Sequence, residues 1–212
     1  MFTQQLINGL ALGAVYALIA LGYTMVYGIL QLINFAHGEV YMIGAYLGII
    51  VFGALTAWGM TAHSLPLALL ITVLASMFFC AVYGAAIERV AYRPLRNAAK
   101  LAPLISAVGM SIILQNVVML AQGKEYKNLP PQLPSAGFDV FGANVSPVQM
   151  FILSASILIM IVLHLFIAKT RLGKAMRATS QDRVMAGLVG ININQVISVT
   201  FMIGSALAAV AG

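Results

Sequence analysis

The stretch Asn34-Phe35-Ala36-His37-Gly38-Glu39 interrupts a long region of the chain that is otherwise almost entirely apolar. It contains two ionisable side chains, His37 and Glu39, and a helix-weakening glycine. Ionisable groups are costly inside a membrane, so those found there more often line a pathway for a substrate or ion than serve a purely structural role. The stretch therefore predicts a transmembrane helix bundle with a broken or re-entrant segment near residues 34–39.

The composition supports a membrane protein. Apolar residues make up 62% of the chain and charged residues 8%, whereas a soluble domain has about 25% charged residues. The mean hydropathy is +1.00. We therefore predict an all-α polytopic membrane protein in which residues 1–212 form one transmembrane domain. No Lys or Arg precedes Arg89, and the first apolar segment is too long for a signal peptide, so we expect the first helix to be retained.

The charged residues and the single cysteine exclude several other functions. The net charge is +6, but the basic residues fall into two short blocks between apolar segments and form no soluble nucleic-acid-binding face. Cys80 is the only cysteine, which excludes an intrachain disulfide and a thiolate metal site. The sequence contains no phosphate-binding loop, catalytic triad or paired His/Cys ligands. We expect no enzyme activity, no metal and no cofactor on this chain.

The apolar segments can be read as membrane spans, because a spanning helix needs about 20 residues. This length predicts five complete spans, at residues 6–30, 40–56, 65–87, 101–121 and 148–168. A sixth begins near Gln195 and is still running at Gly212, so we expect it to be incomplete and the chain to be C-terminally truncated. Small residues spaced four apart predict close helix packing, and they form three rows: Gly9, Gly13 and Ala17; Gly44 and Gly48; Gly204, Ala208 and Gly212.

The basic residues predict the orientation of the spans. Residues 88–100 contain four basic side chains and one acid, and residues 169–194 contain five and one. By the positive-inside rule both loops are cytoplasmic. The loop 122–147 balances Lys124 and Lys127 with acids, so we place it outside. Counting back puts the break at the cytoplasmic leaflet and the N-terminus outside. A re-entrant first segment would invert the N-terminus.

Four residues of the break, Asn34, His37, Gly38 and Glu39, are candidates for the substrate path or its gate. If the chain unwinds here and a helix starts near Glu39, backbone N–H groups would face an anionic group and Glu39 a cation. That arrangement suits a zwitterion such as an amino acid. Alternatively, Asn34 and His37 cap helices, and Glu39 complements the helix dipole, in a structural or gating role.

A second candidate site lies in the cytoplasmic loop 171–194. Thr179 and Asp182 have the spacing of a capping box, and Gly190 is suited to end a helix. They predict one short helix. The residues proposed to couple it to a partner are Arg177, Thr179, Asp182, Arg183, Ala186, Gly187 and Gly190.

The two faces of this short helix differ in character. Met185, Leu188 and Val189 lie on an apolar face. Arg183, Ala186 and Gly187 lie on a face whose small side chains would let a partner approach. Because a helix this short is unstable alone in water, it must rest on something. We consider docking to a soluble partner and, alternatively, an amphipathic connector on the membrane surface.

Several motifs, in order along the chain, closely resemble the permease subunit of bacterial branched-chain amino acid ABC importers. They are GAVYALIALG at 13–22, MVYG at 25–28, INFAHGE at 33–39, GAY at 44–46, ERVAYRPLR at 88–96, TRLGKAMRA at 170–178 and the loop 182–191. The resemblance implies that the signature turn of the family falls on residues 34–39 and its ATPase coupling loop on residues 177–190. Members of that family continue through further helices, which agrees with the expected truncation.

The resemblance also implies a function and a set of partners. It implies import of leucine, isoleucine and valine across the bacterial inner membrane, with ATP hydrolysed on separate cytoplasmic subunits. A periplasmic binding protein would deliver the substrate, and a second related permease would complete the channel. Related urea and short-chain amide permeases have a similar break motif. Two further alternatives are a proton-coupled secondary transporter that uses His37 and Glu39 as a relay, and an assembly subunit without its own path.

Overall fold

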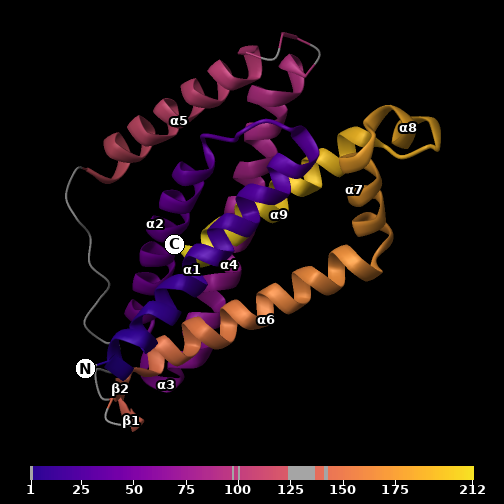
Figure 1. The fold of residues 1–212 in the computed structure, drawn as a ribbon. Coiled ribbons are helices and arrows are strands. Elements are labelled where there is room, and N and C mark those ends of the chain that lie inside the picture. The colour runs from indigo at the N-terminus through magenta and orange to yellow at the C-terminus, as the bar shows by residue number, and fades with distance from the viewer. Residues whose placement is uncertain (1, 97, 100, 124–136, 141–142) are drawn as a thin grey trace.

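The computed structural model describes residues 2–96, 98–99, 101–123, 137–140 and 143–212, and Figure 1 shows a bundle of long helices. Within these ranges six helices are long and apolar enough to cross a membrane. The protein is therefore a multi-pass all-α membrane protein, as predicted. The six helices are α1 (Phe2–Leu30), α2 (His37–Ala57), α4 (Leu65–Ile87), α5 (Leu101–Gln122), α6 (Pro147–Lys169) and α9 (Ile193–Ala211).

Shorter elements connect the long helices. They are α3 (Met60–His63), the π-helix η1 (Glu88–Tyr92), the 3-10 helix η2 (Arg93–Leu95), the strands β1 (Phe138–Val140) and β2 (Ala143–Val145), α7 (Arg171–Gln181) and α8 (Arg183–Leu188). The two strands pair in an antiparallel hairpin. The elements η1 and η2 continue α4 without interruption, so this helical segment runs to Leu95.

The predicted spans agree closely with the observed helices. The first begins at Phe2 and not at residue 6. One detail was wrong. Residues 88–95 are helical and not loop, because η1 and η2 continue the helix, and Pro94 stands at the start of η2, where a missing N–H is tolerated. Helix α9 has 19 residues, which is long enough to cross a membrane.

Helix α9 is the centre of the bundle. It packs against α1, α2 and α4 and is the most buried of the six spans. Gly22, Gly44 and Gly84 make these crossings possible, because a Cβ there would lie 2.8, 2.6 and 2.7 Å from a backbone atom of α9. Two of the predicted rows of small residues are used in this way. They are the row containing Gly44 and the row containing Gly204, where a Cβ would lie 3.0 Å from the Gly22 carbonyl oxygen, whereas a Cβ at Gly9 or Gly13 would meet nothing within 4 Å.

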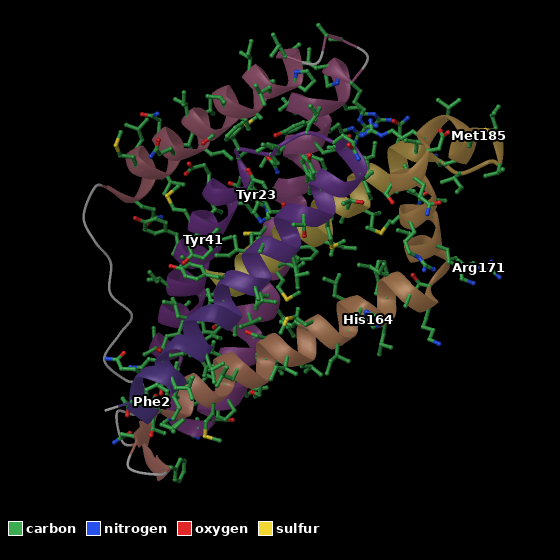
Figure 2. The ribbon with its side chains drawn as sticks, viewed as in Figure 1. Phe2, Tyr23, Tyr41, His164, Arg171 and Met185 are labelled. Atoms are coloured by element: carbon green, nitrogen blue, oxygen red, sulfur yellow. The ribbon has the colours of Figure 1, made fainter. Side chains whose placement is uncertain are left out.

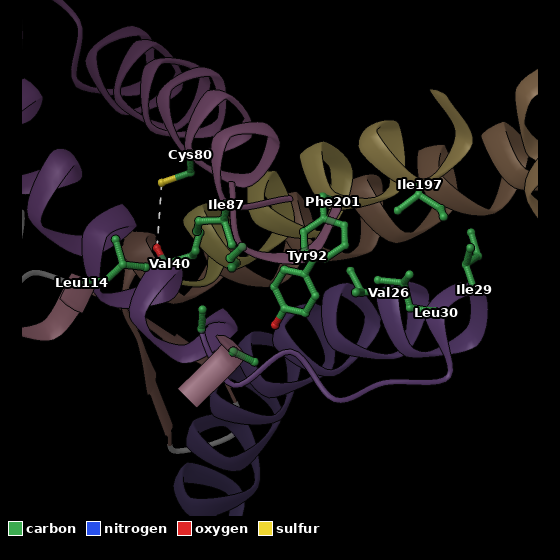
Figure 3. Close-up of a cluster of buried hydrophobic side chains, with 14 of the residues drawn as sticks. Val26, Ile29, Leu30, Val40, Cys80, Ile87, Tyr92, Leu114, Ile197 and Phe201 are labelled. Atoms are coloured by element: carbon green, nitrogen blue, oxygen red, sulfur yellow. Dashed lines mark hydrogen bonds between the residues drawn. The ribbon is translucent and has the colours of Figure 1, made fainter. Parts of the chain in front are cut away.

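The main hydrophobic cluster lies where α9 meets α1, α2 and the extension of α4 (Figure 3). Its largest members are Tyr92 and Phe201, whose ring centroids are 5.1 Å apart. Cys80 is fully buried in the same cluster, with its Sγ 3.9 Å from the carbonyl oxygen of Val40. A thiol in such surroundings acts as a small apolar side chain. The cluster connects α9 to the region of the helix break.

At one end of the bundle, the N-terminal turn of α1 contacts the β1–β2 hairpin. The Gln4 side chain donates to the Asn144 carbonyl oxygen at 3.1 Å and accepts from the Asn144 N–H at 2.8 Å. The break and both basic segments lie at the opposite end (Figure 1). If the basic end is cytoplasmic, as the positive-inside rule predicts, the N-terminus is outside.

The break follows a complete span and does not divide one. Helix α1 has 29 residues, which corresponds to about 43 Å of helix and is enough to cross a bilayer. Residues 31–36 therefore connect two full-length helices, and a re-entrant segment is not observed among the described residues. Lys100, Lys124, Glu125 and Lys127, which contributed to the predicted orientation, lie outside the described residues.

Candidate functional site

The helix break is a short turn held by Asn34. Helix α1 ends at Leu30, after which Gln31 has a φ of 58°, the left-handed conformation common at helix ends. The Asn34 Oδ1 accepts from the Ala36 N–H at 3.1 Å, and the Asn34 carbonyl oxygen accepts from the His37 N–H at 3.1 Å. This geometry starts α2 at His37, three residues before the predicted span of residues 40–56.

Asn34 also links the break to the extension of α4. Its side chain is almost fully buried, and its Oδ1 accepts a second hydrogen bond, from the Tyr92 hydroxyl at 2.8 Å. Tyr92 belongs to the π-helix η1, which directs both Tyr92 and Glu88 into the protein interior. Leaving such a buried group unpaired costs about 1–3 kcal/mol, so Asn34 holds the break against η1.

His37 is packed between α2 and α1. Only 1% of its surface is exposed, its Nε2 lies 3.3 Å from the Ile19 carbonyl oxygen, and its ring meets Tyr23 edge-on at 5.3 Å. Figure 2 labels Tyr23 on this side of α1. A Cβ at Gly22 would lie 2.9 Å from His37 Cε1, so the glycine makes the room that the imidazole occupies.

The other two predicted residues of the break face outward. Gly38 is exposed, and a Cβ at this position would meet nothing within 4 Å. Glu39 is half-buried, and its Oε1 accepts from the Ser111 hydroxyl on α5 at 3.0 Å. The structure thus separates the four residues into an inner pair, Asn34 and His37, and an outer pair. In this conformation only the outer pair is accessible to a ligand without rearrangement.

The second candidate site consists of two helices, α7 and α8, where one was predicted. Thr179 lies inside α7 and donates its hydroxyl to the Ala175 carbonyl oxygen at 2.8 Å. Asp182 caps α8, because its Oδ1 accepts from the N–H groups of Val184 at 2.8 Å and Met185 at 3.0 Å. The predicted capping box is therefore wrong. Asp182 caps α8 without Thr179, and the backbone leaves the helical conformation at Asp182.

The predicted end of this helix at Gly190 is confirmed. Gly190 has a φ of 85°, and its N–H donates to the Gly187 carbonyl oxygen at 3.0 Å. The next N–H, that of Ile191, donates to the Ala186 carbonyl oxygen at 3.0 Å. These two bonds define a Schellman motif, in which a left-handed glycine closes the helix.

The exposed face of α8 is the apolar one. Ala186 is buried, and a Cβ at Gly187 would lie 3.3 Å from Ile193 Cδ1 at the start of α9. Ala186 of the small-residue face, predicted to receive a partner, therefore points toward this chain, whereas Gly187 is itself exposed. The side chains that point away, here called the α8 apolar face, are between 61% and 77% exposed and comprise Val184, Met185, Leu188 and Val189. Met185 lies at the outer end of the molecule (Figure 2).

Arg183 connects α8 to the end of α1. Its Nε donates to the Ile29 carbonyl oxygen at 2.9 Å, and its Nη2 donates to the same atom. That carbonyl is in the last turn of α1 and has no partner within the helix, and a cation there also complements the helix dipole. Burial lowers the pKa of Arg183, but a guanidinium remains charged. Arg177, by contrast, is exposed, with its Nη2 3.4 Å from the Ala168 carbonyl oxygen.

Sequence reasoning missed several residues that position the break. Tyr92 belongs to the quoted motif at 88–96, so the sequence did mark it as a candidate. Its hydrogen bond to Asn34 could not be inferred from that motif. Gly22 likewise ends the quoted motif at 13–22, but nothing in the motif indicated its contact with His37. Ser111 had no distinguishing signal. In the part of the chain that the structure describes, no three His, Cys, Asp or Glu side chains are grouped to hold a metal ion.

Comparison with known families identifies the chain. A family described as branched-chain amino acid transport system, permease component, matches residues 5–212. The chain belongs to this family. The permease is thus a transporter subunit and not an enzyme, as predicted, and the word component implies that further subunits complete the system.

Individual relatives agree with the family. The permease is 51% identical over 216 residues to the high-affinity branched-chain amino acid transport system permease protein BraD of Pseudomonas aeruginosa, with coverage of 99% of this chain and 69% of the relative. It is 47% identical over 215 residues to LivH of Escherichia coli, with coverage of 100% and 69%. A probable branched-chain amino acid transport permease protein of Methanocaldococcus jannaschii is 27% identical over 204 residues, with coverage of 92% and 60%. No solved structure matches.

Proposed function

We propose that this permease forms, with a second related permease, the path by which leucine, isoleucine and valine cross a bacterial inner membrane. Cytoplasmic ATPase subunits supply the energy, and a periplasmic binding protein delivers the substrate. ATP is bound by those partners, and this chain needs no cofactor. The observation that carries the proposal is the family match over residues 5–212, together with the high identity to BraD and LivH.

The α8 apolar face is the proposed contact with an ATPase subunit. It is exposed at the end that carries the basic segments, and it lies outside the candidate membrane spans. Contiguous apolar surface on an otherwise polar loop marks an interaction site. Three features hold this short helix in place, namely the Asp182 cap, the Gly190 closure and the Arg183 bonds to α1. Through Arg183, a displacement of α8 would reach the end of α1 and the break.

Reconstituted transport tests the function. The permease and its partner subunits would be placed in proteoliposomes with ATP inside and the binding protein outside, and uptake of labelled leucine measured. We expect uptake only when ATP and binding protein are both present, and competition by isoleucine and valine. Uptake driven by a proton gradient without ATP would instead indicate a secondary transporter. Competition by urea or acetamide, and not by valine, would indicate a permease for amides.

A gating role for the break predicts that Glu39→Gln slows uptake per assembled complex. Glutamine keeps the size of the side chain and an oxygen that can accept from Ser111, so chiefly the charge is lost. A charge that contributes about 1.4 kcal/mol to the slowest step would change its rate about tenfold, whereas a helix-dipole role is worth only about 0.3–1 kcal/mol. The measurement is initial leucine uptake divided by the amount of complex recovered.

Ser111→Ala is the matched control for Glu39→Gln, because it removes the 3.0 Å hydrogen bond and keeps the charge. We expect Ser111→Ala to slow uptake less than Glu39→Gln does. Wild-type uptake per complex in Glu39→Gln would rule out a charge-dependent role. Equal slowing in both variants would assign the effect to the α2–α5 contact alone.

A further inference from the structure

A polar cavity of about 460 Å³ lies where the extension of α4 meets the start of α9. It is at the basic end of the bundle, and it involves the motif at residues 88–96, whose exposed arginines have no part in the proposed transport path. The polar residues that line it are Glu88, Arg89, Arg93, Asn192, Asn194, Gln195 and Ser198.

The cavity carries an excess of positive charge. Its one acid, Glu88, is almost fully buried and already forms an ion pair with Arg96, and Ser198 donates its hydroxyl to Glu88 Oε2 at 2.6 Å. That ion pair is the only one among the described residues. Arg89 and Arg93 therefore line the cavity without a carboxylate partner in the part of the chain that the structure describes.

The surroundings add to this positive potential. The 19-residue helix α9 begins at the cavity, where the Asn192 side chain accepts from the Gln195 N–H at 3.1 Å, and the N-terminal end of a helix attracts anions. Burial lowers the pKa of Arg96, Glu88 opposes that change, and the nearby charges of Arg93 and Arg183 lower the pKa further. Guanidinium groups bind phosphate oxygens through paired hydrogen bonds. The cavity thus suits a phosphate group.

An apolar surface leads from the cavity toward the middle of the membrane. Arg89 of η1 lines the cavity, and Val82 and Phe78 lie about two and three turns before it, on α4, both well exposed. On α9, Ser198 lines the cavity, and Met202 follows one turn away, also exposed. We call Phe78, Val82 and Met202 the apolar track. A positively charged pocket next to such a track complements an amphiphile, whose anionic headgroup would lie in the pocket and whose apolar chains would lie on the track.

We propose that this cavity binds the phosphate headgroup of an anionic phospholipid from the cytoplasmic leaflet, whose acyl chains lie along the apolar track. Basic pockets between membrane helices on the cytoplasmic side are suited to such headgroups. Free phosphate would contact the arginines but would make no contact with the apolar track. The site is independent of which amino acid the permease carries.

Lipid binding to the purified transporter complex tests this site. The complex in neutral detergent would be titrated with phosphatidylglycerol, phosphatidylcholine or inorganic phosphate, and bound lipid measured by native mass spectrometry. We expect phosphatidylglycerol to bind in preference to phosphatidylcholine. The double variant Arg89→Gln with Arg93→Gln should weaken that binding about thirtyfold, the effect expected for two basic residues near an anionic lipid.

The matched control is Arg171→Gln with Lys174→Gln, which removes two exposed charges at the same end but outside the cavity. We expect it to bind phosphatidylglycerol like the wild type. Equal loss in both double variants, or equal binding of the two lipids, would overturn the proposal. If inorganic phosphate competed as well as the lipid did, the cavity would be a free-anion site. Absence of bound phosphatidylglycerol from the complex would leave the cavity to a partner subunit and also overturn the proposal.

Discussion

Met185→Glu combined with Leu188→Glu is expected to abolish recovery of the ATPase subunits and ATP-driven leucine uptake, while the permease still inserts into the membrane. Both side chains are exposed on the α8 apolar face, so glutamate there fits the isolated chain. In an apolar interface, a carboxylate without a partner costs about 3–5 kcal/mol, which weakens association roughly a hundredfold to several thousandfold. Copurification of the complex and uptake in proteoliposomes would measure the effect.

Ser180→Glu combined with Gln181→Glu is the control for this prediction. Both residues are exposed at the end of α7 and lie outside the α8 apolar face, so the variant adds the same charge at almost the same place. We expect it to keep the ATPase subunits. If the Met185/Leu188 variant also kept them, α8 would not be the docking helix. Loss of membrane binding by the loop alone, with ATPase recovery unchanged, would support the surface-connector alternative.

Gly84→Leu is expected to prevent the bundle from folding. A Cβ at Gly84 would lie 2.7 Å from the Phe201 carbonyl oxygen on α9, and the backbone of α9 cannot move away without separating it from α1 and α2. Overpacking costs about 1–3 kcal/mol for small excess volume and occasionally more, and four added carbons exceed that case. We expect little monodisperse protein after detergent extraction. Gly84→Ala should fold with a lower thermal midpoint.

Gly53→Leu is the comparison for Gly84→Leu, because a Cβ at Gly53 would meet nothing within 4 Å. Both residues lie within transmembrane helices, so the two variants differ mainly in the space available. We expect Gly53→Leu to be recovered in wild-type amounts with an unchanged thermal midpoint. Equal stability of the two leucine variants would contradict a close α4–α9 crossing.

The spans were predictable because each membrane helix forms its own backbone hydrogen bonds. Length and apolar composition therefore mark a span without any knowledge of its neighbours. The predicted segment 65–87 matches α4 at both ends. The predicted and observed helix boundaries differ where the helical hydrogen bonding does not follow the apolar composition. The polar residues after Ile87 remain helical in η1 and η2, and Asp182 divides one predicted helix into two.

The candidate site was only partly predictable. The polar residues of the break could be recognised because they interrupt an apolar region. The directions in which their side chains point could not be predicted from the sequence. Asn34 and His37 are buried against Tyr92 and α1, whereas Glu39 bonds to Ser111 on α5. For α8, helical periodicity correctly predicted that apolar and small side chains lie on different faces. Which face is free depends on where Arg183 and its neighbours find partners.

The sequence by itself determined the class of protein, the positions of the spans and the family, because these depend on composition, local hydrogen bonding and motifs. Only the tertiary structure decided that α9 is the central helix, that glycines on α1, α2 and α4 receive it, and that Glu88, Arg96 and Ser198 meet beside a cavity. The physical reason is that helices in lipid are apolar on all sides. Hydrophobicity then carries no information about which face meets a neighbour, and close packing and a few buried polar contacts decide it.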